Sequence, residues 1–133
     1  MITWSETPPE PAEYVAMRAA TGLGARTLEA AKIGLAGGLF ATVARDPQGL
    51  AAMARLVGDG GAFVQLVDVM VRADLGGQGL GREVVARCLA WAEAHLPVSC
   101  LVGLHTDPTK IPFYAAHGFR EDTGMLLHIG DRR

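Results

Sequence analysis

The sequence has few of the features that mark secreted, membrane-spanning or nucleic-acid-binding proteins. Its 133 residues include two cysteines, Cys88 and Cys100, which form no CxxC pair and have no histidine at metal-ligand spacing. No apolar run approaches the ~20 residues that a membrane-spanning helix needs. The formal net charge is −2, so the chain has no general attraction to nucleic acid or to anionic membranes. We therefore expect no bound metal, no nucleic-acid partner and no membrane partner.

The residues that are present suit one folded domain. Half of them are hydrophobic and a fifth are charged, which is ordinary for a globular protein. No internal repeat, low-complexity segment or linker divides the chain, so we expect a single domain over residues 1–133. The first residues, MITWSETPPEP, lack the basic start and apolar middle of a signal peptide. With two unpaired cysteines, this start favours a cytoplasmic location.

Hydrophobic periodicity and turn residues predict an α/β fold of the α+β type. Short turns join the first three expected strands, which indicates an antiparallel meander. A helix separates the fourth strand from the third, so these two should be parallel. We expect a mixed, mostly antiparallel sheet flanked by helices. Strands are predicted at Leu39–Arg45, Leu50–Val57, Ala62–Val71, Val98–Leu104 and Met125–Ile129, and helices at Pro11–Ala20, Thr27–Ile33, Leu80–His95 and Phe113–His117.

A glycine-rich loop follows the most apolar expected strand and opens the longest expected helix. It reads Gly76-Gly77-Gln78-Gly79-Leu80-Gly81. Successive glycines let backbone N–H groups approach an anion closely, and the helix N-terminus adds the positive end of its dipole. Arg82 contributes a charge in the first helical turn. The arrangement predicts a phosphate-binding loop.

Two other phosphate-binding motifs do not fit this loop. The nucleotide P-loop needs lysine and then serine or threonine after the last glycine, and Arg82 and Glu83 stand there instead. The dinucleotide motif Gly-x-Gly-x-x-Gly needs a third glycine. That position is occupied by Arg82 when the motif is counted from Gly77, and by Val84 when it is counted from Gly79. A flexible loop with no ligand is the remaining alternative.

Together with a second motif, this loop resembles the GNAT superfamily of N-acetyltransferases. The family pattern is Arg/Gln-x-x-Gly-x-Gly/Ala after a strand, and Gly76 stands here in place of the usual arginine or glutamine. The second motif is Phe113-Tyr114-Ala115-Ala116-His117-Gly118-Phe119, which is similar to the Phe-Tyr-x-x-x-Gly-Phe found near the C-terminus of the family. The resemblance covers about Leu39 to Ile129.

The resemblance implies that acetyl-coenzyme A is the acetyl donor. It implies that the thioester lies near a splay between the Ala62–Val71 and Val98–Leu104 strands. Backbone groups of one strand would bind the pantetheine arm, and the glycine loop would hold the pyrophosphate. The residues implied in cofactor binding are Val69, Met70, Val71, Gly76, Gly77, Gln78, Gly79, Leu80, Gly81, Arg82 and Tyr114.

Two side chains are candidates for catalysis. Tyr114 matches the family tyrosine that often protonates the departing thiolate; packing against the cofactor is its other interpretation. Asp68 is a lone carboxylate in a very apolar strand, so we consider it as the base that deprotonates the amine or as the anchor of a water chain. Its alternative is a buried partner to a cation or to backbone amides. In a regular strand, Asp68 and Met70 face opposite to Val69 and Val71.

The expected acceptor is a primary amine on a small molecule or amino-acid derivative, with a protein N-terminus or lysine second. We expect the segment Tyr14–Ile33 to bind it, where Arg18 and Arg26 either meet a substrate carboxylate or are solvated. A non-catalytic acyl-coenzyme A sensor and a nucleotide-binding domain are the alternatives from other functional classes. Many relatives dimerise through their sheets, so the resemblance is consistent with a homodimer.

Overall fold

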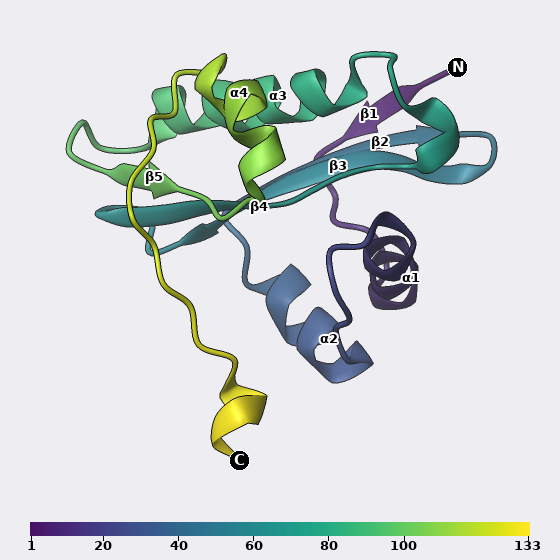
Figure 1. Ribbon diagram of the computed structural model, residues 1–133. Coiled ribbons are helices and arrows are strands. Elements are labelled where there is room, and N and C mark those ends of the chain that lie inside the picture. The colour runs from purple at the N-terminus through teal and green to yellow at the C-terminus, as the bar shows by residue number, and fades with distance from the viewer.

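The computed structural model describes residues 1–133 as a five-stranded sheet with helices on both faces. Figure 1 shows α3 and α4 on one face of the sheet and α1 and α2 on the other. None of the helices has the length and apolar character needed to cross a bilayer. The strands are β1 (Thr3–Ser5), β2 (Phe40–Asp46), β3 (Gly49–Gly58), β4 (Phe63–Val71) and β5 (Leu101–Gly103), and the helices are α1 (Pro11–Thr21), α2 (Leu28–Ala36), α3 (Leu80–His95) and α4 (Ile111–Ala115).

The strands follow one another across the sheet in the order β1-β2-β3-β4-β5. The first four are antiparallel, and β5 is parallel to β4. The predicted meander, the parallel last pair and the mostly antiparallel sheet are therefore confirmed. The edge strand β1 was not predicted, because three residues between Met1 and a proline-rich stretch carry no periodic pattern.

Local sequence signals place the helices well. The predicted start at Thr27 is confirmed, because its hydroxyl accepts the N–H of Ala30 over 3.1 Å and caps α2. That helix runs on to Ala36, beyond the predicted Ile33. Ala31 and Leu35 are buried, whereas Ile33 is 69% exposed. Helix α3 has the predicted bounds, and its capping residue Gly79 adopts a left-handed conformation.

The hydrophobic core forms two layers because helices cover both faces of the sheet. On one face α3 buries Val84, Val85 and Cys88 completely. On the other, α1 and α2 bury Tyr14 and Leu35 against the sheet. Strand β3 lies between the two layers, and each of its residues from Leu50 to Leu56 is buried. Its many alanines have low strand propensity, but their small size fits a strand that is covered on both sides.

Strands β4 and β5 pair only over three residues, from Phe63 with Leu101 to Gln65 with Gly103. Beyond that point β4 continues to Val71 without β5 beside it. The predicted splay between these strands is confirmed, although β5 is shorter than the predicted Val98–Leu104.

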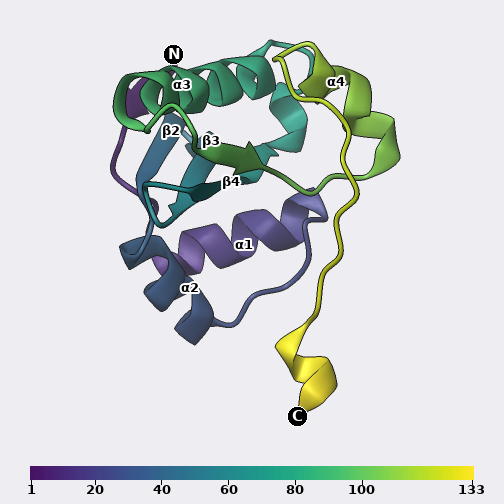
Figure 2. The ribbon, with the colours of Figure 1, turned by 90° about the vertical axis from the view of Figure 1, so that its left-hand side faces the viewer.

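The predicted last strand, Met125–Ile129, is wrong. These residues pair with no other strand, and every residue from 120 to 133 is exposed. Figures 1 and 2 both show this segment leaving α4, passing the sheet and extending away from it on the side of α1 and α2. The residues have strand-forming side chains but no neighbouring strand in the same chain.

Candidate active site

The candidate site begins at a bulge in β4. Asp68 has φ of 55° and is the one non-glycine residue with a positive φ. Val67 lies opposite Arg55 and Met70 opposite Met53, so three steps along β4 match two along β3. One extra residue is therefore inserted in β4, which defines a β-bulge.

The bulge changes which side chains of β4 face which layer. Before it, Leu66 packs in the α3 layer, and after it Val69 and Val71 do so. Asp68 and Met70 face α1 and α2 instead. The prediction that Asp68 and Met70 face opposite to Val69 and Val71 is confirmed. Without the bulge, a strict alternation from Leu66 would direct Asp68 into the apolar α3 layer.

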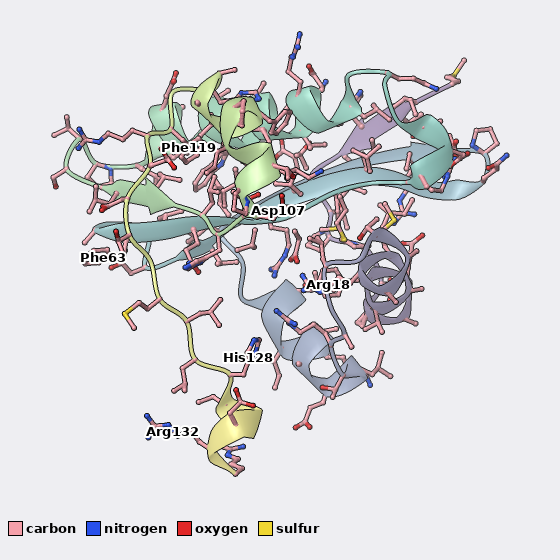
Figure 3. All side chains as sticks on the ribbon, in the orientation of Figure 1. Arg18, Phe63, Asp107, Phe119, His128 and Arg132 are labelled. Carbon is pink, nitrogen blue, oxygen red and sulfur yellow. The ribbon has the colours of Figure 1, made fainter.

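The Asp68 carboxylate sits in a buried cluster of charged and polar groups. Arg18 Nη1 donates to Oδ1 over 2.5 Å, and Arg55 Nε donates to Oδ2 over 2.8 Å. The hydroxyl of Tyr14 also donates to Oδ2, over 2.9 Å. Burial, with the adjacent carboxylate, raises the pKa of Tyr14, so the phenol stays a donor. Figure 3 shows Arg18 pointing from α1 into the space below the sheet.

This cluster joins four elements. Arg18 also donates to the carbonyl of Gly24, and Arg55 donates to the carbonyl of Gly34 in α2 over 3.0 Å. Arg18 is therefore buried rather than solvated, and its guanidinium is already hydrogen-bonded within the chain. The base role of Asp68 stays a prediction, and the contacts match its alternative, a buried partner to cations.

Beyond the bulge, backbone groups of β4 face the gap left by β5. The N–H of Arg72 donates to the carbonyl of Ala51 in β3 over 2.8 Å. Because amides alternate sides along a strand, the N–H groups of Val71 and Val69 point the other way, toward the splay. The amide of Met70 points toward β3. This geometry offers an extended ligand two backbone positions that no strand of the chain occupies.

The glycine loop follows directly. Gly77 and Gly79 have φ of 80° and 81°, and a Cβ built on either would meet nothing within 4 Å. The N–H groups of Gly77, Gln78 and Gly79 make no hydrogen bond within the chain. Since the first N–H groups of a helix have no intrahelical partner, those of Leu80 and the next two residues are also free. These groups fit a pyrophosphate, which needs several convergent donors.

Arg72 fixes the start of this loop. Its guanidinium pairs with Asp46 in β2 and with Asp74, and it donates to the carbonyl of Leu50 over 3.1 Å. These contacts raise the pKa of Arg72 and lower that of Asp46. The loop is therefore held to the β2–β3 hairpin. Arg82 is exposed in the first turn of α3 and is free to move toward an anion.

Tyr114 lies in α4, half-buried against the α3 layer. Its ring meets Phe113 and Phe119 edge-on, with centroids 4.9 Å and 6.1 Å away. Burial first, and then the charge of Asp107, raise the pKa of the phenol. Asp107 itself accepts the N–H of Thr109 over 2.9 Å, and Figure 3 shows it at the foot of α4, beside the sheet.

The predicted residues thus fall into two groups. The glycine loop, the start of α3 and the end of β4 are consecutive parts of one strand–loop–helix unit on the α3 side, and Tyr114 packs on that side as well. Asp68 belongs to the cluster on the opposite side. Sequence reasoning missed Tyr14 and Arg55 as partners of Asp68. The available signal was Arg55, which is flanked by alanine and leucine in an apolar strand and needs an anionic partner there.

Comparisons with known proteins agree on the fold. A probable acetyltransferase of meticillin-resistant Staphylococcus aureus is 29% identical, with a TM-score of 0.90, covering 96% of this chain and 99% of its own. That match extends into residues 120–133. A GNAT-family acetyltransferase of Streptococcus pneumoniae matches at 24% identity and a TM-score of 0.78, covering 96% of this chain and 98% of its own.

A more distant structure has a defined acceptor. The ribosomal-protein-S18-alanine N-acetyltransferase of Escherichia coli is 18% identical, with a TM-score of 0.73, and the match covers 92% of this chain and 80% of that one. At such identities the pneumococcal and E. coli structures show the fold alone. No curated protein matches the chain in sequence.

The family model described as "Acetyltransferase (GNAT) domain" matches residues 36–121, which hold the bulge, the glycine loop and α4. Members of this family generally bind acetyl-coenzyme A, and the fold implies acyl transfer from it. The splayed strands, the bulge and the glycine loop are the parts of this chain that suit such a donor. The chain belongs to the GNAT acetyltransferases.

Proposed function

We propose that the protein transfers the acetyl group of acetyl-coenzyme A to a primary amine. The main observation behind this proposal is that β4 and β5 stop pairing after Gln65 and Gly103. It leaves the amides of Val69 and Val71 open, immediately before the glycine loop. A ligand with an extended arm and a pyrophosphate suits this succession of an open strand edge and a helix N-terminus.

The backbone of β4 would hold the donor. The N–H of Val71 would bind the pantetheine arm as an added strand would, Met70 lies next to it, and the N–H of Val69 is left for the thioester carbonyl. The N–H groups from Gly77 to Arg82 would hold the pyrophosphate, with Gly76 leading into the turn. Gly76 has no side chain to offer, so the backbone provides the contacts that an arginine or glutamine shares in relatives.

The transfer joins the amine nitrogen to the acetyl carbonyl carbon and breaks that carbon's bond to sulfur. The negative charge that develops on the carbonyl oxygen needs a donor, and the N–H of Val69 faces the splay where it would lie. The sulfur leaves as a thiolate, and Tyr114 would give it a proton. The proton that the amine nitrogen loses passes to solvent water, from which Tyr114 regains its own. Because the pKa of Tyr114 is raised, its phenol keeps that proton at neutral and mildly alkaline pH.

The side chains of β4 offer no free negative charge that would attract a strongly cationic acceptor. Asp68 is the only acidic residue of β4, and two guanidinium groups already neutralise it. It offers no anionic subsite to a polycation. An apolar site also favours the neutral amine, which is the nucleophilic form. We therefore propose a small-molecule or amino-acid amine as acceptor, with a protein amine second.

Two measurements test the proposal separately. Calorimetry with acetyl-coenzyme A tests donor binding, and the Gly77→Ala variant should weaken it. Release of free coenzyme A thiol during incubation with an amine panel tests the transfer. Binding without amine-dependent thiol release would identify a sensor rather than an enzyme. Absence of binding would overturn the donor site itself.

A further inference from the structure

A second hollow lies on the face of the sheet that α3 covers, away from the donor site. It is formed between one flank of α3 and the β1–β2 edge of the sheet, whereas the splay lies at the β4–β5 edge. Its volume is about 630 Å³, which is within the range of small-molecule sites. Neither the donor site nor the expected acceptor segment includes any residue that lines it.

Aromatic rings form much of its wall. Trp4 comes from β1, Phe40 from β2 and Trp91 from α3. The ring of Trp91 stacks on that of Phe40, with centroids 5.3 Å and planes 18° apart, and on that of His95, at 4.5 Å and 12°. The ring of His95 is held in place because its Nδ1–H donates to the carbonyl of Trp91 over 2.9 Å. The wall therefore presents several ring surfaces in fixed orientations.

Small residues of α3 keep the hollow open. Five of the lining residues recur three or four positions apart, so they share one flank of the helix: Arg87, Ala90, Trp91, Ala94 and His95. Ala90 and Ala94 are exposed, and their methyl groups leave the space beside the aromatic side chains unfilled. A planar ligand with one aromatic ring and a short polar group has room there.

The chain already places one cation on this surface. The guanidinium carbon of Arg87 lies 3.9 Å from the centroid of the Trp4 ring, which is a cation–π contact. The charge of Arg87 is matched by Glu83, since Nε donates to Oε1 over 2.9 Å. Arg87 therefore adds no unmatched positive charge to the hollow. Its contact also shows that an aromatic ring of this wall accommodates a planar guanidinium.

Glu6 supplies a negative charge that no cation of the chain matches. Its carboxylate lines the hollow just beyond β1 and makes no ion pair. An unpaired carboxylate beside ring surfaces attracts a cation and repels an anion. A guanidinium or amidinium group is planar, binds a carboxylate through two parallel N–H···O bonds and stacks on aromatic rings. It therefore suits both features of the hollow better than an ammonium group does.

We propose that this hollow binds a small organic cation that combines an aromatic ring with a guanidinium or amidinium group. The cationic group pairs with Glu6, and the ring packs against Trp4, Phe40 and Trp91. A protonated guanidinium has no nucleophilic nitrogen, so this ligand is not an acetyl acceptor. The site is therefore separate from the proposed reaction and does not depend on it.

Tryptophan fluorescence with benzylguanidine as the probe tests the site, because the chain has two tryptophans and both line the hollow. Titration of the wild type should change the emission in a saturable way. Benzylurea has nearly the same shape without the charge. We expect it to bind at least about tenfold more weakly, because it cannot form a charge-assisted pair with the carboxylate. Calorimetry measures both affinities independently.

Two variants test the charge and the space separately. Glu6→Gln removes the negative charge and should weaken benzylguanidine binding about tenfold. Ala94→Leu fills the hollow and should abolish the fluorescence response. Both residues are exposed, so the variants should fold, which far-UV circular dichroism checks. The matched control is Glu93→Gln, the same change at an exposed residue of α3 outside the hollow, and its affinity should equal that of the wild type.

An unchanged emission in the wild type, with no heat of binding, would overturn the proposal. Equal affinities for benzylguanidine and benzylurea, or for the wild type and Glu6→Gln, would overturn it as well, since the carboxylate would then play no part. Unchanged binding to Ala94→Leu would show that the cation binds elsewhere on the molecule. Weakened binding in Glu6→Gln and Ala94→Leu, with wild-type affinity in Glu93→Gln, is the result that supports the site.

Discussion

Arg55 Nε and Asp68 Oδ2 lie 2.8 Å apart, where β4 bulges away from β3. Both side chains are almost fully buried, at 8% and 3% exposure. Asp68 occupies the left-handed backbone region, which costs a non-glycine residue about 1–2 kcal/mol. The ion pair compensates for that strain and fixes the bulge, which turns Val69 and Val71 toward the donor side. We therefore propose that Asp68 positions the site without touching the substrate.

Asp68→Asn should lower the free energy of unfolding by roughly 3–5 kcal/mol, because it leaves two buried guanidinium groups without their counter-charge. Urea unfolding followed by circular dichroism measures this. Glu83→Gln is the control. It breaks an exposed pair with Arg87 and should leave stability nearly unchanged. An Asp68→Asn variant that is as stable as the wild type, but whose rate no longer rises with pH, would instead support Asp68 as the base.

Tyr114→Phe should lower kcat by on the order of 10²-fold, the lower end of the usual range for a general acid. The raised pKa of Tyr114 sets the pH dependence. In the wild type, kcat/KM should rise as the amine loses its proton. It should not decline at any pH up to about 10, the pH at which an unperturbed tyrosine would already be half ionised. Steady-state rates from pH 6 to about 10 test this. Unchanged turnover in Tyr114→Phe would remove the acid role.

Gly77→Ala should raise the KM for acetyl-coenzyme A about tenfold, which is ~1.4 kcal/mol of binding. A Cβ there meets nothing within 4 Å, so the cost comes from the left-handed backbone at φ of 80° and from a methyl group beside the free amides. Gly130→Ala is the control, since Gly130 is exposed, open and without positive φ. Equal KM values for the two variants would argue against the loop as the pyrophosphate site.

Acid should destabilise the fold. Hydrogen bonds from Arg45 lower the pKa of Glu13, and those from Arg72 lower the pKa of Asp46. A carboxyl with a lower pKa in the folded state adds stability above its unfolded pKa, which is about 4. That stability disappears as the pH falls through the folded-state value. Thermal unfolding from pH 7 down to about 2.5 should show a falling Tm, with a shallower fall in Arg72→Gln. A constant Tm would contradict this.

Much of the donor site could be predicted from the sequence because its signals are local. Glycine spacing and the helix start at Leu80 depend on near neighbours, and both are where they were expected. Thr27 capped its helix for the same reason. Such features need no knowledge of the rest of the fold.

The contacts of Asp68 could not be predicted, because they join residues 50 and 54 positions apart in the chain. A carboxylate in an apolar strand indicates that a cationic or hydrogen-bonding partner is required. Only the folded chain shows that Arg18 and Tyr14 are such partners. The strand prediction for Met125–Ile129 was wrong for a different reason. Its composition correctly indicates a strand former, but pairing depends on a partner strand, which this chain does not place beside it.

Mass spectrometry of the acceptor tests acetyl transfer to an amine most directly. The protein is incubated with acetyl-coenzyme A carrying an isotopically labelled acetyl group and with a panel of small amines, amino-acid derivatives and peptides. We expect at least one amine to gain one labelled acetyl group, and we expect Tyr114→Phe to slow this gain. Tight donor binding with no labelled amine anywhere in the panel would contradict it.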